Sequence, residues 1–195
     1  MKPRTFMESK YDVIVVGAGH AGCEAAHSAA TMGCSVLLIT MNLETIAKMS
    51  CNPAMGGVAK GQIVREIDAL GGMSGIITDN TMIQFRMLNR SKGVAMWSPR
   101  AQSDRWRFSE AWRLALESNP LIDFFQDGVS SLLFDGQRVR GVVTNMGMSF
   151  KSRSVVLTTG TFLNGLIHIG DKQFGGGRAG ESAAYGITED LVKLG

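Results

Sequence analysis

Proline is scarce in this 195-residue sequence, which has 4 prolines against 24 glycines. That ratio argues against a disordered linker and favours backbone that passes close to a ligand. Long apolar runs are absent as well, since no stretch is long enough to span a membrane. Met1–Lys10 is short and polar, without the apolar core and cleavage site of a secretory signal. We therefore expect a soluble, globular protein that does not associate with membranes.

Cysteine is equally sparse, and its spacing argues against two common uses. Cys23, Cys34 and Cys51 are odd in number and stand in neither metal-ligand nor CxxC spacing. The pattern predicts free thiols in a reducing compartment, hence a cytoplasmic protein, and no metal site. Cys23 and Cys34 lie in or beside the first predicted helix, where an inert, packed thiol is the simpler interpretation.

An excess of one charge sign is also missing, because the formal net charge of the whole chain is only +3. The charge is unevenly placed, however, since residues 86–113 hold 7 basic and 2 acidic side chains, together with all 3 tryptophans. Cationic side chains with interleaved aromatic rings suit the phosphates and splayed bases of RNA. The alternative is that Trp106, Phe108 and Trp112 are core residues beside a solvated basic face. For these aromatic residues we favour the alternative.

The N-terminal part of the chain reads as a βαβ unit. Tyr11–Val16 and Ser35–Thr40 are short apolar runs typical of buried parallel strands, and an alanine-rich helix lies between them. A GxGxxG turn joins the first strand to the helix, which is the context that dinucleotide binding requires. The turn is predicted to hold a pyrophosphate at the helix N-terminus. Its residues are Gly17, Ala18, Gly19, His20, Ala21 and Gly22, of which His20 faces either the cofactor or solvent.

One expected residue is missing from this unit. The second strand of a dinucleotide-binding fold usually ends in an acid that accepts a hydrogen bond from a ribose hydroxyl. That place is taken here by Thr40, and Glu44 comes four residues late. The ribose contact must therefore be weaker, or come from Asn42, Glu44 or the backbone. This absence makes a simple NAD dehydrogenase a poorer interpretation.

The middle of the chain is less regular. Residues 41–61 read as a loop and 62–70 as a helix, whereas 73–96 has no clear pattern. Ser98 and Pro99 have the residue types of an N-cap and first helical position, so they predict the start of a helix that ends near Ser118. A further helix is expected from Thr188.

After Pro120 the pattern changes to short strand-like runs separated by turn residues. The runs cover residues 122–125, 129–134, 139–144, 148–151 and 155–158. They predict an antiparallel meander and then a return strand that leads into Thr159-Gly160. This arrangement resembles flavoproteins of the glutathione-reductase type. We therefore predict an α/β, Rossmann-like FAD-binding domain of that type with an inserted antiparallel β-meander, whose cofactor site also includes Val129, Thr159 and Gly160.

Cys51 lies in an unusual loop, Ser50–Gly57, between turn-forming residues. Lys48, Lys60 and a following helix N-terminus could lower the pKa of its thiol and so make it reactive. An inert thiol packed under the loop explains the same pattern. The chemistry of the loop alone leaves these two interpretations evenly balanced.

Several motifs, taken together, resemble the MnmG (GidA) family of tRNA-modifying flavoproteins. They follow one another in order over nearly the whole chain after residue 11. The motifs are GAGHAGCEAA at 17–26, SCNPAMGG at 50–57, DALGG at 68–72, IQFRMLN and SKG between 83 and 93, RAQSDR at 100–105, GTFLNGLIHIG at 160–170 and GGGRAGE at 175–181.

The resemblance implies a specific reaction. Family members bind FAD and, with the GTPase MnmE, add a carboxymethylaminomethyl or aminomethyl group at C5 of the tRNA wobble uridine. NADH reduces the flavin, and methylenetetrahydrofolate is thought to supply the carbon. The resemblance makes Cys51 the candidate catalytic residue and implies a homodimer that forms a heterotetramer with MnmE. Four basic residues in family-like motifs are expected to contact tRNA, substrate base or flavin: Arg86, Lys92, Arg100 and Arg105.

Family members are much longer than this chain, so we expect residues 1–195 to be the N-terminal part of an FAD-binding domain. The NADH-related region and the C-terminal helical region for tRNA and MnmE are expected to lie outside it. Alone, this part is expected to be inactive. The rival interpretations are an FAD- or NAD-dependent oxidoreductase acting on a small molecule, and a non-enzymatic nucleotide- or RNA-binding module.

Overall fold

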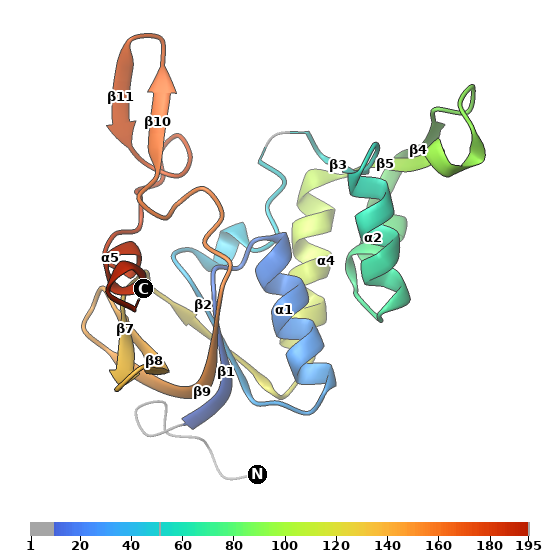
Figure 1. The fold of residues 1–195 in the computed structure, drawn as a ribbon. Helices are drawn as coiled ribbons and strands as arrows, with labels where there is room; N and C mark the ends of the chain where they lie inside the picture. The colour runs from blue at the N-terminus through green and yellow to red at the C-terminus, as the bar shows by residue number, and fades with distance from the viewer. Residues whose placement is uncertain (1–9, 51, 195) are drawn as a thin grey trace.

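The computed structural model describes residues 10–50 and 52–194, which form a mixed α/β fold (Figure 1). Its centre is a six-stranded sheet with the strand order β6-β2-β1-β9-β8-β7. The strands in chain order are β1 Lys10–Val16, β2 Val36–Thr40, β6 Ile122–Gln126, β7 Val129–Asp135, β8 Arg138–Thr144 and β9 Ser149–Leu157. Strands β6, β2, β1 and β9 pair with one another in parallel, as the Rossmann prediction requires.

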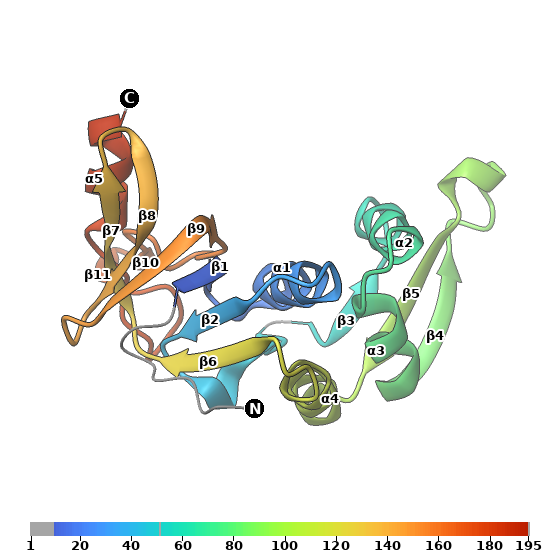
Figure 2. The ribbon, with the colours of Figure 1, turned by 90° about the horizontal axis from the view of Figure 1, so that it is seen from below.

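Both faces of the parallel strands are covered, which explains their continuous apolar runs. Helix α1 (His20–Thr31) and helix α4 (Arg105–Glu117) pack with one cluster of buried side chains. A second cluster lies on the other face with helix α5 (Ile187–Leu194), which contacts β7. Figure 2 shows α5 beside β7 and β8, far from α1 and α4. The predicted βαβ unit and the predicted C-terminal helix are thus confirmed.

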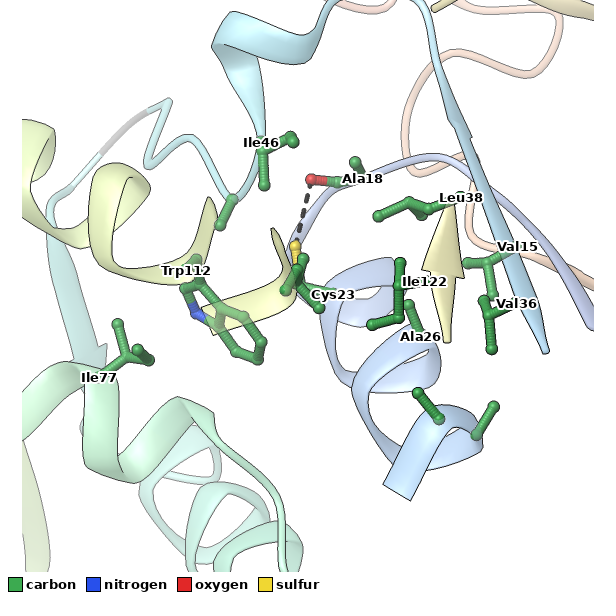
Figure 3. Close-up of a cluster of buried hydrophobic side chains, with 14 of the residues drawn as sticks. Val15, Ala18, Cys23, Ala26, Val36, Leu38, Ile46, Ile77, Trp112 and Ile122 are labelled. Atoms are coloured by element: carbon green, nitrogen blue, oxygen red, sulfur yellow. Dashed lines mark hydrogen bonds between the residues drawn. The ribbon is translucent and has the colours of Figure 1, made fainter. Parts of the chain in front are cut away.

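The first cluster contains Cys23 and Trp112 among aliphatic side chains (Figure 3). Cys23 is fully buried, and its Sγ lies 3.5 Å from the Ala18 carbonyl oxygen. Burial raises the pKa of the Cys23 thiol to about 12, so this thiol is not ionised at neutral pH. Cys34 is half-buried against the same cluster. The interpretation of both cysteines as inert therefore agrees with their surroundings.

The meander differs from the prediction in two respects. The run at 122–125 is not part of it, because β6 pairs in parallel with β2. The runs at 148–151 and 155–158 form a single strand, β9, whose first residues pair with β8 before it continues along β1. Polar residues hide this continuity in the sequence, since Arg153 and Ser154 are exposed while Ser152 is buried. The meander is therefore β7-β8-β9.

The prediction of a helix start at Ser98-Pro99 is wrong. These residues begin strand β5 (Ser98–Ser103), and Pro99 lies opposite Met87. The helix starts seven residues after Ser98, where the Asp104 carboxylate accepts hydrogen bonds from the backbone N–H groups of Trp106 and Arg107 at 3.0 and 3.1 Å. Serine before proline favours extended backbone as readily as a helix cap, so composition alone did not separate the two.

Residues 54–103 build a lateral subdomain, in which the helix predicted at 62–70 is confirmed, whereas residues 73–96 showed no clear pattern in the sequence. Its three-stranded sheet has the order β3-β5-β4, with β3 at Ala54–Gly56 and β4 at Met82–Leu88. Helices α2 (Lys60–Ala69) and α3 (Ser74–Thr81) pack beside it. Figure 1 shows β4 and β5 extending away from the main sheet as an arm.

On the opposite side of the molecule, the hairpin of β10 (Leu166–Ile169) and β11 (Lys172–Gly175) projects from the main body (Figure 1). Short 3-10 turns cover Leu43–Thr45 and Val94–Met96. Among the described residues, no helix combines the length and apolar character needed to cross a membrane.

Candidate functional site

A cleft of about 680 Å³ lies at the carboxyl ends of the parallel strands. Ligands of open α/β sheets bind at this edge. The cleft is lined by the turn after β1, the end of β2, the crossing from β6 to β7, the segment after β9 and the loop before α5. Five segments that are distant in sequence thus surround one space.

The glycine turn has the shape that a pyrophosphate site needs. Gly17 has φ of +99°, and a Cβ there would lie 2.6 Å from the Thr158 carbonyl oxygen. A Cβ on Gly22 would collide with the Gly17 carbonyl oxygen, so Gly22 permits close packing of helix and strand. A Cβ on Gly19 would meet nothing within 4 Å. Gly19 lines the cleft and precedes the first turn of α1, whose N–H groups lack partners within the helix.

Thr158 holds the turn in place, although no motif in the sequence points to it. Its backbone N–H donates to the Val16 carbonyl at 2.9 Å. Its Oγ1 lies 2.9 Å from the same carbonyl oxygen and 2.8 Å from that of Gly17. The hydroxyl therefore joins the end of β9 to the first residue of the turn. The only signal in the sequence was its place before Thr159-Gly160.

The structure brings together most of the predicted cofactor-binding residues. Six of the nine line the cleft: Gly17, Ala18, Gly19, Val129, Thr159 and Gly160. His20, Ala21 and Gly22 do not line it. The His20 ring lies beneath the turn, with Nε2 3.1 Å from the Ala47 carbonyl oxygen and an edge contact to Phe108 at 5.5 Å. Burial, with the charges of Lys60 and Arg178, lowers the pKa of His20, so its ring is neutral at pH 7.

A two-residue crossing brings Val129 to the cleft. Strands β6 and β7 lie at opposite ends of the sheet order, yet only Asp127 and Gly128 separate them in sequence. The sheet must curl for the chain to make this step. The Asp127 N–H donates to the Thr40 carbonyl at 3.0 Å, so the start of the meander sits against the end of β2.

The end of β2 carries no acid on the cleft side. Thr40 and Asn42 line the cleft, whereas Glu44 lines a separate groove beside Trp106. The Asn42 Oδ1 accepts the Glu44 backbone N–H at 2.8 Å. Glu44 therefore lies outside the cleft lining, where a cofactor ribose would have to be contacted.

The four predicted tRNA or substrate residues lie apart from the described cleft lining. Arg86 and Arg100 are directly opposite one another on β4 and β5, so the structure brings these two together. Lys92 lies in the loop between those strands, and its carbonyl accepts the Trp97 indole N–H at 3.3 Å. Arg105 begins α4 and is separate from the arm.

The aromatic residues near these cations divide into two groups. Phe108 and Trp112 are fully buried, which confirms the core interpretation for both. For Trp106 that interpretation is wrong, because its side chain is 82% exposed. In a helix with 3.6 residues per turn, Trp106 lies about 200° around the axis from Phe108, so the two side chains face opposite sides of α4.

A profile of the family described as Glucose inhibited division protein A matches residues 12–195 of this sequence. The chain belongs to the GidA family. Curated relatives carry the name tRNA uridine 5-carboxymethylaminomethyl modification enzyme MnmG. The protein from Flavobacterium psychrophilum is 71% identical over 97% of this chain, and that from Porphyromonas gingivalis is 64% identical over 97%. The chain spans 30% of the length of both relatives.

Solved structures of the GidA family have the same fold. Aquifex aeolicus GidA is 48% identical, with a TM-score of 0.90 over 95% of this chain and 31% of that one. A GidA-related protein from Thermus thermophilus is 26% identical, with a TM-score of 0.68 over 96% of this chain and 69% of its own. PqsL from Pseudomonas aeruginosa, at 16% identity and a TM-score of 0.58, shares the Rossmann-type fold.

The GidA-like motif at 175–181 supplies residues at the cleft for which the sequence alone indicates no role. Arg178 and Glu181 both line the cleft and form an ion pair at 3.6 Å. Lys48 pairs with the same carboxylate, also at 3.6 Å. The Arg178 guanidinium lies over the Phe162 ring, 5.2 Å from its centre. In the sequence, the glycines around Arg178 indicate only a flexible loop and no ligand contact.

Cys51, the candidate catalytic residue in the GidA-like motif at 50–57, lies outside the described residues. The preceding residue, Ser50, lines the cleft. No group of three or more metal-ligating side chains is present in the described part of the chain.

Proposed function

We propose that this chain binds FAD in the cleft at the carboxyl ends of its parallel strands. The observation that carries the proposal is the turn at 17–22, where a side-chain-free Gly19 borders the cleft at the N-terminus of α1. The β7-β8-β9 meander and the return of β9 to Thr159-Gly160 support a flavoprotein rather than a simple NAD dehydrogenase. The family relationship points the same way.

In this proposal the residues that line the cleft bind the pyrophosphate, position the turn or form the cleft walls. The backbone of residues 17–19 and the first turn of α1 bind the pyrophosphate, while Thr158 keeps the turn in position. Val129, Thr159 and Gly160 form the walls on either side. When bound, the flavin supplies redox chemistry that protein side chains lack.

We further propose that the complete protein modifies C5 of the tRNA wobble uridine with a carboxymethylaminomethyl or aminomethyl group. The names of the close relatives support this activity. Following the family resemblance, the proposal includes tRNA, the GTPase MnmE, NADH as reductant and methylenetetrahydrofolate as carbon donor. It also includes a homodimer that forms a heterotetramer with MnmE, in the cytoplasm.

The arm and the adjoining helix start provide the proposed RNA-contacting cations. Arg86 and Arg100 place two positive charges side by side, and Lys92 adds a third in the loop beyond them. Arg90 lies over the Trp97 ring, 6.0 Å from its centre. Phosphate contacts of this kind are sequence-independent and sensitive to salt. Arg105 is proposed to contribute from α4.

Cys51 is proposed as the nucleophile. Carbon C5 of uridine becomes reactive once a group has added at C6, and a thiolate is suited to that addition. Cys51→Ser should therefore abolish modification while flavin binding is retained. Flavin absorbance of the purified variant and mass analysis of wobble uridine in cells that carry it measure the two effects separately. Modification that survives the substitution would assign the thiol a structural role.

The experiment that tests the whole proposal combines two measurements. Flavin absorbance of the purified full-length protein tests cofactor binding, and mass analysis of wobble uridine in cells lacking the protein tests the activity. Bound flavin together with loss of the modified uridine is the expected result. A colourless protein would contradict the FAD proposal, and unchanged wobble uridine would contradict the tRNA proposal.

A further inference from the structure

The end of β2 lacks an acid at the cleft, but the end of the neighbouring strand β6 has one, Asp127. Asp127 follows β6 directly and lines the cleft together with Thr40. Its backbone N–H is bonded to the Thr40 carbonyl at 3.0 Å, so the two strand ends are adjacent. Among the described residues, Asp127 and Glu181 are the carboxylates that line the cleft. Glu181 is already paired with Lys48 and Arg178.

The Asp127 carboxylate is held in place from one side. Its Oδ1 accepts the Gly128 N–H at 2.7 Å, and its Oδ2 accepts the Met146 N–H at 3.0 Å. Burial opposes ionisation, but these two backbone donors and the nearby Thr144 hydroxyl lower the pKa of Asp127, so the group is negatively charged at neutral pH.

The Asp127 carboxylate keeps capacity for a ligand. An ionised carboxylate offers about four acceptor positions, and the Gly128 and Met146 N–H groups occupy two of them. Acceptor positions are therefore left for a ligand in the cleft. A ribose hydroxyl is the donor expected there, because a dinucleotide whose pyrophosphate lies on the turn after β1 extends its adenosine over the neighbouring strand ends.

We infer that Asp127, from the end of β6, accepts a hydrogen bond from one hydroxyl of the adenosine ribose and so takes the role of the missing acid on β2. This inference rests on the proposed binding of FAD. It assigns the ribose contact to a residue 87 positions after Thr40. It also replaces the three candidates left open by the sequence, which were Asn42, Glu44 and the backbone.

A binding experiment with modified cofactors tests the inference. The flavin-free protein is titrated with FAD and with its 2′-deoxyadenosine and 3′-deoxyadenosine analogues, and flavin fluorescence gives the affinities. The unmodified protein should bind one analogue about tenfold or more weakly than FAD, since the hydrogen bond is to a charged acceptor. Asp127→Asn should reduce that discrimination to about threefold or less.

The ratio of affinities separates ribose recognition from a purely structural role. If Asp127 only organised the turn, Asp127→Asn would weaken FAD and both analogues by the same factor and leave the ratio unchanged. That outcome would overturn the inference. Glu44→Gln is the matched control, because Glu44 lines the other groove and its substitution should not alter the ratio.

Measurements on the unmodified protein keep the test decisive even if Asp127→Asn does not fold. Equal affinity for FAD and both analogues would exclude a ribose contact by Asp127 without any variant. Discrimination that disappears in Glu44→Gln would place the contact on the β2 loop instead. Failure of the unmodified protein to bind FAD at all would contradict the proposed function itself, and so is distinguishable from failure of this inference.

Discussion

Two glycines of the turn after β1 have opposite surroundings, which makes them a matched pair. Gly19→Ala places a methyl group in the open cleft, with backbone φ of −71° that alanine tolerates. We expect it to unfold at nearly the same denaturant concentration as the unmodified protein, within about 1 kcal/mol, and to bind FAD at least about tenfold more weakly. Urea unfolding and flavin titration measure the two effects.

Gly22→Ala, in contrast, should act mainly on the free energy of unfolding. Its new methyl group would collide with the Gly17 carbonyl oxygen and approach Thr158 Oγ1 to 2.7 Å. Overpacking against fixed backbone costs about 1–3 kcal/mol, so we expect the stability to fall clearly. Equal losses of stability in both variants would show that the cleft-facing position of Gly19 is not what distinguishes them.

At the scale of the element, one carboxylate fastens α5 to the meander. Asp190 is 9% exposed and accepts the Leu132 backbone N–H at 2.9 Å. Asp190→Ala leaves that buried N–H without its partner, and we expect a loss of about 1–3 kcal/mol in the free energy of unfolding at pH 7. Asp171→Ala, at an exposed hairpin position, is the control and should be neutral.

The effect of Asp190 should depend on pH in a defined direction. The hydrogen bond from Leu132 and the charge of Lys193 lower the pKa of Asp190 below its unfolded value. Its contribution is therefore complete above about pH 4 and decreases as the pH falls through the folded pKa. The difference between the unmodified protein and Asp190→Ala, measured by urea unfolding, should be constant between about pH 7 and pH 5 and shrink only below about pH 4. A difference that stays constant well below about pH 4 would mean that packing alone holds the helix.

Elements were predictable where one local signal was sufficient. The strand, turn and helix at 11–32 and the strand ending at Thr40 needed only an apolar run and glycine spacing. Strand β9 was divided in two because Lys151–Ser154 is polar and only its partners reveal the continuity. Strand β5 was read as a helix start because Ser98-Pro99 fits both structures.

At the scale of the whole molecule, the basic arm stands apart from the cleft, so RNA binding and cofactor binding should be separable. Arg100→Glu is expected to weaken tRNA binding and to flatten its dependence on salt, because a phosphate contact is replaced by repulsion. Filter binding across a salt series measures the slope, and flavin absorbance should be unchanged. Arg138→Glu, on the exposed start of β8, is the control. A salt slope that Arg100→Glu leaves intact would remove this residue from the RNA surface.

The sequence by itself determined the dinucleotide turn, the parallel strands and the family, because each depends on residues close together in the chain or on motifs in a fixed order. Six of the predicted site residues do line the cleft, but only the tertiary structure added Asp127, Arg178 and Glu181 to them. The position of Asp127 beside Thr40 depends on a sheet that curls so that two residues connect its opposite edges. No local pattern encodes that curl. The acid missing after β2 was visible in the sequence, whereas its proposed replacement became visible only when β6 was placed beside β2.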